Sequence, residues 1–419
     1  MRIPIIIMLL CINSPTIYAQ DKNNAKPLVL DQVILKVLEK SPQLSIHSFE
    51  SQAAASRIRQ AQQTKPYELK LGFDNFAGNY KDENTERMET SLSLVKVLEP
   101  ENTISTRGNI AQLESTLLKN QQDATRLDLL ANATQQFIHV AVDQHHLEIA
   151  RNHLSLIKHT AKIVSQRVRA GKSHIAEQRR LGIELARAEV ELEHAEHELL
   201  SSRLKLATYW GESNTSFPDI QTNLYQLDPV KALSKLEELL NNNPDLVRFA
   251  SEKRIAQARL KLAESRRSGN WEVSGGIRHF KSTNDAALML SLSIPLGTNS
   301  RAQAEIEEMD FLSQREPFRY RQQWLRLYSS LYELYQELMH ARTAYNILNK
   351  KIIPLASQAA SDYEQGYKTG RFSLLELKEA QGTLLNARLE KVTTAANYHR
   401  LKIEIERLTG VDLSSGEKQ

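Results

Sequence analysis

The stretch RAGKSHIAEQRRLGIELARAEVELEHAEHELLSSRLKLATYWG, residues 169–211, has a counterpart 199 residues further along the chain. Residues 368–410 read KTGRFSLLELKEAQGTLLNARLEKVTTAANYHRLKIEIERLTG. The offset aligns three pairs without a gap: Gly171 with Gly370, Lys172 with Arg371, and Gly211 with Gly410. Both stretches are rich in Leu, Ala, Glu and Arg and contain no proline, which predicts two long helices.

The letters AGKS at 170–173 resemble the end of a phosphate-binding loop, which needs a glycine five residues before the Gly-Lys pair. Gln166 occupies that position, and the counterpart TGRFS at 369–373 keeps only the glycine and a basic residue. Glycine commonly ends a helix in the left-handed conformation, and a basic residue suits its negative end. Ser173 or Ser373 can begin the next helix. We therefore predict helical hairpin tips at about 168–174 and 367–373.

The similarity between the two halves extends upstream of the tips. SPQL at 41–44 pairs with NPDL at 243–246, YELKLGFDNF at 67–76 with WEVSGGIRHF at 271–280, and SLSL at 91–94 with SLSI at 291–294. The chain is therefore interpreted as a tandem duplication. We expect a first repeat at 28–211, a linker at 212–228, a second repeat at 229–410 and a tail at 411–419.

Each half is predicted to hold two short helices, two strands, a long helix, a tip and another long helix. From about 101 to 169 and from 301 to 365 the apolar residues recur at helical spacing. A helix of roughly 65 residues would be about 100 Å long. Pro317 and Pro354 are expected to kink the second of these helices.

Four strands are predicted, at about 67–76, 88–97, 271–280 and 286–296, where apolar and polar residues alternate. This pattern gives each strand one apolar face. Four strands cannot close a barrel, because the smallest closed membrane barrels use about eight. The sheet could pack its apolar face on its own helices, or several copies could pool their strands. Pooling is favoured because the strands lie at one end of very long helices, where little helical surface could cover them.

The first twenty residues differ from the rest of the chain. They contain an apolar run from Ile3 to Ile12 and are predicted to form a signal peptide, 1–19, cleaved after Ala19. The only cysteine, Cys11, lies in this segment, and Leu10 before it argues against lipidation. The mature chain then lacks disulfides and cysteine metal sites. No other segment approaches the length of apolar residues that a transmembrane helix needs.

The net charge of +4 with 25% charged residues gives no reason to expect nucleic acid as a partner. Neither G-x-S-x-G, H-E-x-x-H nor a glycine-rich dinucleotide loop occurs in the sequence. The many acidic residues of the helices have the spacing of ion pairs with Lys and Arg. We therefore expect a protein that is not an enzyme and that carries no cofactor.

The sequence resembles those of TolC-type outer-membrane efflux proteins. The resemblance is carried by the duplicated unit and by three stretches: LSLSIPLG at 290–297, IIPLASQAASDYEQGYKTGRFSLLELKEAQ at 352–381 and LTG at 408–410. The resemblance covers about 28–410, and the chain length suits the heavy-metal branch of that family. The stretch SLVKVLEPENTISTRG at 93–108 departs from the family pattern, and the first tip has Val168 where the second has Tyr367.

The resemblance implies a mainly helical fold with a small β part. Tandem antiparallel helical hairpins would form an α-barrel in the periplasm, and each chain would give four strands to a trimeric, twelve-stranded transmembrane β-barrel in the outer membrane. The implied partners are two further copies, outer-membrane lipid, a periplasmic adaptor (membrane fusion) protein at the hairpin tips, and an inner-membrane pump of the RND or ABC type.

The resemblance also implies functional residues near the tips. Acidic residues beyond the second tip, Glu376 and Glu379, would line the narrow periplasmic aperture, with Glu177 as a contribution from the first half. The alternative is that they belong to an ordinary solvated helix face. The residues expected to contact the adaptor are Gly171, Lys172, Ser173, Gly370, Arg371, Phe372 and Ser373.

The histidines of the sequence give a weak indication of a metal site. His139, His146 and His153 recur every seven residues, and His194 and His197 have an i, i+3 spacing that can share a metal. A transport conduit should not hold its cargo tightly, so we interpret these histidines as polar residues of solvated helix faces and predict no metal site.

The function predicted from the sequence is a passive outer-membrane conduit of a tripartite efflux or secretion system. One alternative is a soluble periplasmic coiled-coil or adaptor protein without channel activity, although adaptors need lipoyl-like and β-barrel modules that this sequence lacks. A secreted hydrolase is a second alternative, which the missing nucleophile and metal motifs argue against.

Overall fold

The computed structural model describes residues 26–76, 87–229 and 231–410. The signal peptide predicted for 1–19, the tail 411–419 and most of the loop between the first two strands lie outside the described residues. Within this part of the chain, the elements follow the same order in both halves.

The first half contains α1 (Leu30–Lys40), α2 (Pro42–Ala61), β1 (Tyr67–Asp74), β2 (Glu89–Leu98), α3 (Glu101–Arg169) and α4 (Ile175–Thr208). Pro42 stands in the first turn of α2, where its missing N–H costs no hydrogen bond. The 69 residues of α3 correspond to about 100 Å of helix. Its first turn carries Glu101 and its last turn Arg167 and Arg169, which complement the helix dipole.

The second half contains α5 (Leu233–Leu240), α6 (Pro244–Ser265), η1 (Arg266–Ser268), β3 (Trp271–Phe280), β4 (Asp285–Ser293), α7 (Thr298–Ile347), η2 (Leu348–Ile352), α8 (Ile353–Thr369) and α9 (Leu374–Thr409). The π-helical turn η2 precedes Pro354, whose ring cannot fit a regular helix interior. In contrast, α7 continues through Pro317.

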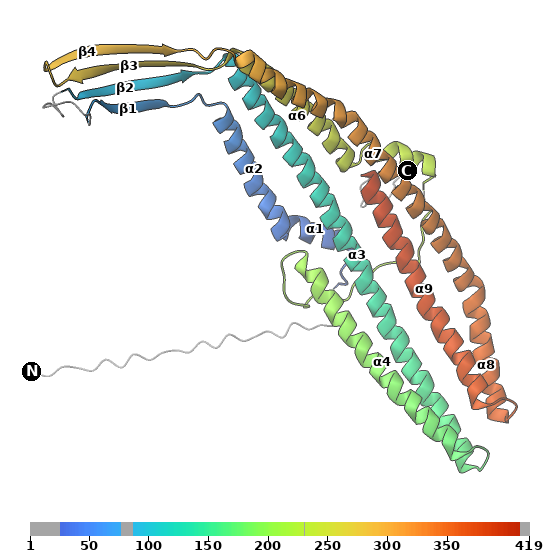
Figure 1. Ribbon diagram of the computed structural model, residues 1–419. Coiled ribbons are helices and arrows are strands. Elements are labelled where there is room, and N and C mark those ends of the chain that lie inside the picture. Colours follow the sequence, from blue (N-terminus) through green and yellow to red (C-terminus); the bar gives the residue numbers. More distant parts are fainter. Residues whose placement is uncertain (1–25, 77–86, 230, 411–419) are drawn as a thin grey trace, which may run out of the picture.

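The helices form a curved wall with the sheet at one end and the two hairpin tips at the other (Figure 1). Near the sheet, α2 contacts α3, α3 contacts α6 and α6 contacts α7. Near the tips, α4 contacts α3, α3 contacts α9 and α9 contacts α8. The wall is therefore four helices wide, with α2 and α4 at one edge and α7 and α8 at the other.

The four strands continue the wall as one antiparallel sheet in the order β1-β2-β3-β4. The register places Leu71, Leu92, Ile277 and Leu288 in one row across all strands. Because neighbours in a row point to the same side, this row defines an apolar face. The opposite face carries the ion pairs Lys70–Glu272 and Arg278–Glu89, at 3.1 and 2.9 Å.

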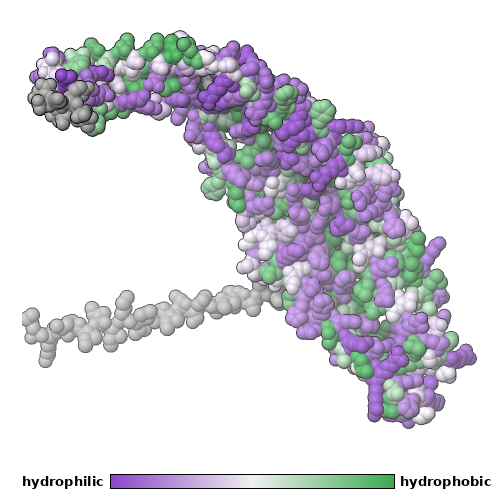
Figure 2. All heavy atoms as spheres, in the orientation of Figure 1, coloured by the Kyte–Doolittle hydropathy of each residue, from purple (hydrophilic) through white to green (hydrophobic). Residues whose placement is uncertain are grey.

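The apolar face of the sheet is not covered by the helices of the same chain. Its large side chains are between 48% and 88% exposed: Leu69, Leu71, Phe73, Leu92, Leu94, Ile277, Leu288, Leu290 and Leu292. Figure 2 shows hydrophobic residues gathered on the sheet, whereas the helical wall is largely hydrophilic on this side. The alternative in which the sheet packs on its own helices is therefore wrong.

The largest core lies halfway along the wall. There α1, the end of α4 and the segment 212–229 pack against α3 and α9, and they bury Phe137, Trp210 and Leu224. A second core near the tips contains Leu154, Leu181 and Leu377. Among the described residues, no helix has the length and apolar character needed to cross a membrane.

Candidate functional site at the hairpin tips

Glycines end the first helix of each hairpin. Gly171, just after α3, has φ 69°, and Gly370, just after α8, has φ 83°. Both angles lie in the left-handed region that side chains disfavour, so glycine is required for these tight turns. The sequence therefore sets the position of both tips through local backbone geometry.

The two tips begin their second helices differently. Ser373 is the N-cap of α9, and its hydroxyl accepts a hydrogen bond from the Glu376 backbone N–H. In the first tip the N-cap is His174, whose ring nitrogen accepts from the Ala176 N–H at 3.1 Å. The expectation that Ser173 begins α4 is wrong, because its hydroxyl accepts from Arg167 Nε instead, at 3.1 Å.

Arg167 connects the two hairpins to each other. Its guanidinium donates to the backbone carbonyls of Tyr367 and Lys368, at 2.7 and 3.1 Å, and to the carbonyl of Lys172 at 3.3 Å. It also lies over the Tyr367 ring, 4.8 Å from the ring centre. One cation on α3 thus binds the end of α8 and the turn of its own hairpin.

The Tyr367 hydroxyl adds a second connection, since it donates to Glu177 Oε2 at 2.8 Å. Tyr367 is almost fully buried, and burial raises the pKa of its hydroxyl, with a further increase from Glu177. The phenol therefore stays protonated and remains a donor. We call Arg167, Ser173, Glu177 and Tyr367 the tip latch.

The remaining predicted contact residues lie around the latch. Lys172 and Arg371 are exposed at the two turns. The Phe372 ring lies 4.6 Å from that of Tyr363, and a side chain at Gly366 would collide with it. Phe372 is thus largely occupied within its own hairpin, so Lys172 and Arg371 offer the more accessible side chains.

The three candidate aperture residues are placed differently. Glu376 and Glu379 are exposed on the first turns of α9. The Glu376 carboxylate accepts from the Ser373 backbone N–H at 2.8 Å, and this bond, with that of the Ser373 hydroxyl, lowers the pKa of Glu376. Glu177 is instead partly covered and engaged in the latch.

His194 and His197 are both exposed on α4, and His197 lies 3.4 Å from Glu193 of the same helix. Within the described part of the chain, no group of three His, Cys, Asp or Glu side chains is placed to hold a metal ion.

Sequence reasoning missed Arg167 and Tyr367 as a pair. The available signal was a difference between the two repeats. With the offset of 199 residues, Arg167 aligns with Gly366 and Val168 aligns with Tyr367. These substitutions between repeats provide a cation in one hairpin and a phenol in the other. A difference between duplicated halves is therefore where a contact between them could have been sought.

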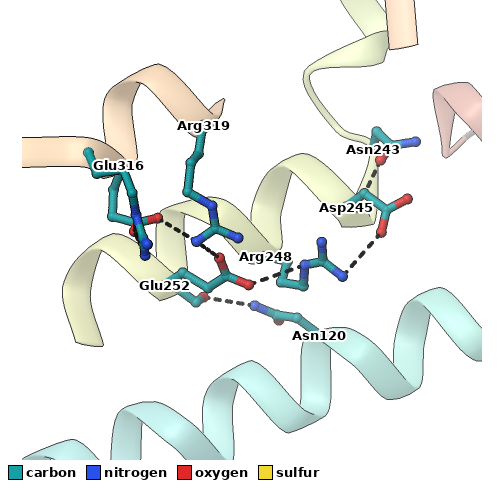
Figure 3. Close-up of polar contacts among 9 residues, drawn as sticks. Asn120, Asn243, Asp245, Arg248, Glu252, Glu316 and Arg319 are labelled. Carbon is teal, nitrogen blue, oxygen red and sulfur yellow. Dashed lines mark hydrogen bonds and ion pairs between the residues drawn. The ribbon is translucent and has the colours of Figure 1, made fainter. Parts of the chain in front are cut away.

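A second polar cluster joins α3, α6 and α7 (Figure 3). Arg319 pairs with Glu316 and with Glu252, both at 3.0 Å, and Glu316 is only 4% exposed. Asn120 of α3 donates to the Ser251 hydroxyl at 3.0 Å. A cavity of about 510 Å³ adjoins the cluster. Because the acidic groups of this cluster are paired with arginines, we conclude that the cluster stabilises the packing of α6 against α7 and is not a catalytic site.

Comparison with known proteins identifies the class of this wall and sheet. Residues 236–411 match the model of the outer membrane efflux protein family. The cobalt-zinc-cadmium resistance protein CzcC of Cupriavidus metallidurans is 24% identical over 306 residues, which are 73% of each chain. The second half of the chain is therefore similar to the outer membrane efflux protein family.

Solved structures of other proteins show the same fold. CusC superposes with a TM-score of 0.76 at 15% identity over 91% of both chains. VceC from Vibrio cholerae gives a TM-score of 0.72 at 16% identity, over 91% of this chain and 96% of VceC. The predicted fold class, mainly helical with a four-stranded antiparallel sheet, is confirmed.

The match of residues 236–411 agrees with the predicted channel function and with the predicted place in the outer membrane. Members of this family are efflux channels and not a class of enzymes. They work with adaptors and inner-membrane pumps in tripartite systems.

Proposed function

We propose that the chain closes with two further copies into a passive conduit, which docks by its tips on a periplasmic adaptor joined to an inner-membrane pump. The observation that supports this proposal best is that the wall has two open edges along its whole length. The sheet ends in β1 and β4, and the helical wall ends in α2 and α4 on one side and α7 and α8 on the other. A wall of this kind can be completed by identical copies joined edge to edge.

The sheet favours closure by copies. Three copies with four strands each would supply twelve strands, above the minimum of about eight for a closed membrane barrel. The strands are 8 to 10 residues long, close to the 9–11 residues of a strand that crosses a bilayer. Pairing β1 of one copy with β4 of the next would leave the apolar face toward lipid and the polar face toward the lumen.

The helical edges carry apolar stripes that suit the same closure. Five exposed residues of α7 recur every seven positions: Phe311, Phe318, Leu325, Tyr332 and Met339. Phe318 and the buried Leu327 are nine residues apart, which places them on opposite sides of the helix. On the other edge, Ile183, Val190 and Leu204 of α4 are exposed at multiples of seven. Seven-residue apolar spacing is the pattern by which long helices pack side by side.

Along the helices, exposed charges on one edge of the wall occur at levels where the other edge has charges of opposite sign. Starting from the tips, α4 presents Arg180 and then Glu193, whereas the other edge presents Asp362 and then Lys351. Glu193 and Lys351 each lie about 27 Å along the helix from the tip end. Opposite charges would therefore meet at both levels when α4 of one copy lies against α8 and η2 of the next, which favours this alignment over a shifted one.

Two measurements test the proposed conduit. The mature chain purified in detergent is expected to have the mass of three copies, and after reconstitution into a planar bilayer it is expected to conduct ions. A monomer that stays in solution without detergent and fractionates with soluble periplasmic proteins would contradict the proposal. That result would favour the coiled-coil alternative.

The exposed turns predict where the adaptor binds. Replacing Lys172 and Arg371 by glutamate should weaken binding to the periplasmic adaptor by about tenfold or more, because like charges at an interface cost several kcal/mol. Both side chains are exposed, so the trimer should persist. Co-purification with the adaptor measures the effect, and Arg169→Glu, on the last turn of α3, is the matched control. An equal loss of adaptor binding in the Arg169→Glu control would mean that the net charge of the tips, and not these two positions, determines binding.

Glu376 and Glu379 are proposed to form rings of carboxylates at the periplasmic aperture. Replacing both by alanine should reduce the preference of the reconstituted pore for cations severalfold, since charged rings set the sign of the permeating ion. The reversal potential under a KCl gradient measures this preference. Glu177→Ala serves as the comparison, because that carboxylate is engaged by Tyr367. An unchanged reversal potential in the double variant would exclude both residues from the aperture.

A further inference from the structure

Two polar atoms are buried without a partner halfway along α3. Asp143 is 5% exposed, and its Oδ2 has no hydrogen-bond partner among the described residues. The Nε2 atom of His146, one turn further along, is also shielded from solvent and without a hydrogen-bond partner in the described chain. Both lie beside the largest core of the wall, among apolar neighbours on α3 such as Val142 and Leu147.

A buried carboxylate in this state is energetically costly, because the charge loses its water and gains no compensating bond. Among the basic groups near Asp143 are His146 and His139, and Nδ1 of His139 lies 3.9 Å from Asp143 Oδ1. This distance is too long for a hydrogen bond. The Nε2 atom of His146 also has no hydrogen-bond partner in the described chain, and a neutral imidazole carries a nitrogen lone pair that can bind a metal ion. The carboxylate thus lacks a cation, and the imidazole lacks a donor or a Lewis acid.

The three side chains share one face of α3. Residues 139, 143 and 146 are separated by four and three positions, which places them within about 60° around the helix. His139 is half exposed, with 53% of its side chain accessible, whereas Asp143 and His146 lie deeper. The series therefore leads from the surface of the wall to the two unpartnered atoms, as an entry route to a buried site would.

We propose that Asp143 and His146, with His139 at the entrance, bind one divalent transition-metal ion. Neutral imidazole nitrogens with a carboxylate oxygen are a donor set that suits Zn²⁺ and Co²⁺. Side-chain rotation must bring the donors together, because no three such groups of the described chain already stand in a metal-binding arrangement. The proposal does not depend on the conduit, since it follows from the unpartnered atoms alone.

The chain contains a matched pair for comparison. His194 and His197 of α4 also have an i, i+3 spacing, but both are exposed, and so is Glu193, the carboxylate beside His197. If exposed histidines alone explained metal binding, this pair would bind as well as the site on α3. Replacing it should leave the proposed site intact.

The experiment uses the full chain purified in detergent, stripped with a chelator and titrated with ZnCl₂ in a calorimeter. One Zn²⁺ per chain is expected for the wild type and for the double variant His194→Gln/His197→Gln. Asp143→Asn and His146→Gln should each weaken binding by about tenfold or more, because each removes a ligand. Titration with CoCl₂ adds the visible absorption of a coordinated Co²⁺, which the two variants should lack.

His139→Gln guards against a misfolded variant, because this side chain is half exposed and its replacement should leave the fold unchanged. It is expected to weaken Zn²⁺ binding severalfold. Two results would overturn the proposal: a wild type that binds no Zn²⁺, or a site that is lost only in the His194→Gln/His197→Gln variant. If the wild type binds no Zn²⁺, a water molecule or a proton would lie between Asp143 and His146 instead. A chain that conducts as a trimer but binds no Zn²⁺ would reject the metal site and not the conduit.

Discussion

Arginine at Leu288 and Leu290 is expected to keep the chain out of the outer membrane. Both residues lie on the apolar face of β4 and are more than four-fifths exposed in the single chain. An arginine on the lipid face of a membrane strand costs about 2–4 kcal/mol at the bilayer midplane. The double variant therefore costs about 4–8 kcal/mol per chain, and a trimer carries this cost three times.

Membrane fractionation followed by detergent extraction measures this effect, with the share of the chain in the outer-membrane fraction as the readout. The matched control is Ser291→Arg/Ser293→Arg, which places two arginines on the same strand but on the polar face. There Ser293 pairs with Glu272 in the register, so an added cation finds a carboxylate nearby. If both double variants reach the membrane equally, the apolar face does not contact lipid.

The strands could be predicted because alternation is a local signal. Leu69, Leu71 and Phe73 alternate with polar residues in the sequence, and the structure places them on one face. The pairing of β2 with β3 was beyond such reasoning, because Leu92 and Ile277 are far apart in the sequence. The two inner strands come from different repeats, so the sheet joins the halves of the duplication.

The tips were predictable to the extent that backbone conformation decides them. Gly171 and Gly370 are needed for left-handed turns, and a glycine at the end of a helical pattern indicates such a turn. The choice of His174 over Ser173 as N-cap was not predictable, because Arg167 engages the Ser173 hydroxyl from the preceding helix. The burial of Asp143 was likewise hidden, since it depends on the packing of elements that are distant in the sequence.

Removing the Arg167 side chain is expected to raise the conductance of the reconstituted pore. In the proposed conduit the hairpins α3–α4 and α8–α9 narrow the lumen at their tips, and opening requires them to separate. Arg167 opposes this separation by donating to the carbonyls of Tyr367 and Lys368 across the two hairpins. A hydrogen bond to a charged group contributes about 1.5–3 kcal/mol, and every 1.4 kcal/mol changes an equilibrium about tenfold.

Arg167→Ala should therefore favour the open state by about tenfold or more in each copy. Tyr367→Phe should have a smaller effect in the same direction, because it removes the hydroxyl that bonds to Glu177 and keeps the ring that packs in the core of the tips. Single-channel recording in a planar bilayer gives the conductance and the open fraction of each variant.

Arg169→Ala is the matched control for the latch. Arg169 lies two residues further along α3 and is exposed, and within the described residues its side chain donates only to the Ser165 carbonyl of its own helix, at 3.4 Å. It carries the same charge at nearly the same height, so a general loss of positive charge at the tips would affect both variants alike. An increase limited to Arg167→Ala and Tyr367→Phe would assign the closed state to contacts between the hairpins, whereas equal recordings for Arg167→Ala and Arg169→Ala would show that the latch does not hold the aperture.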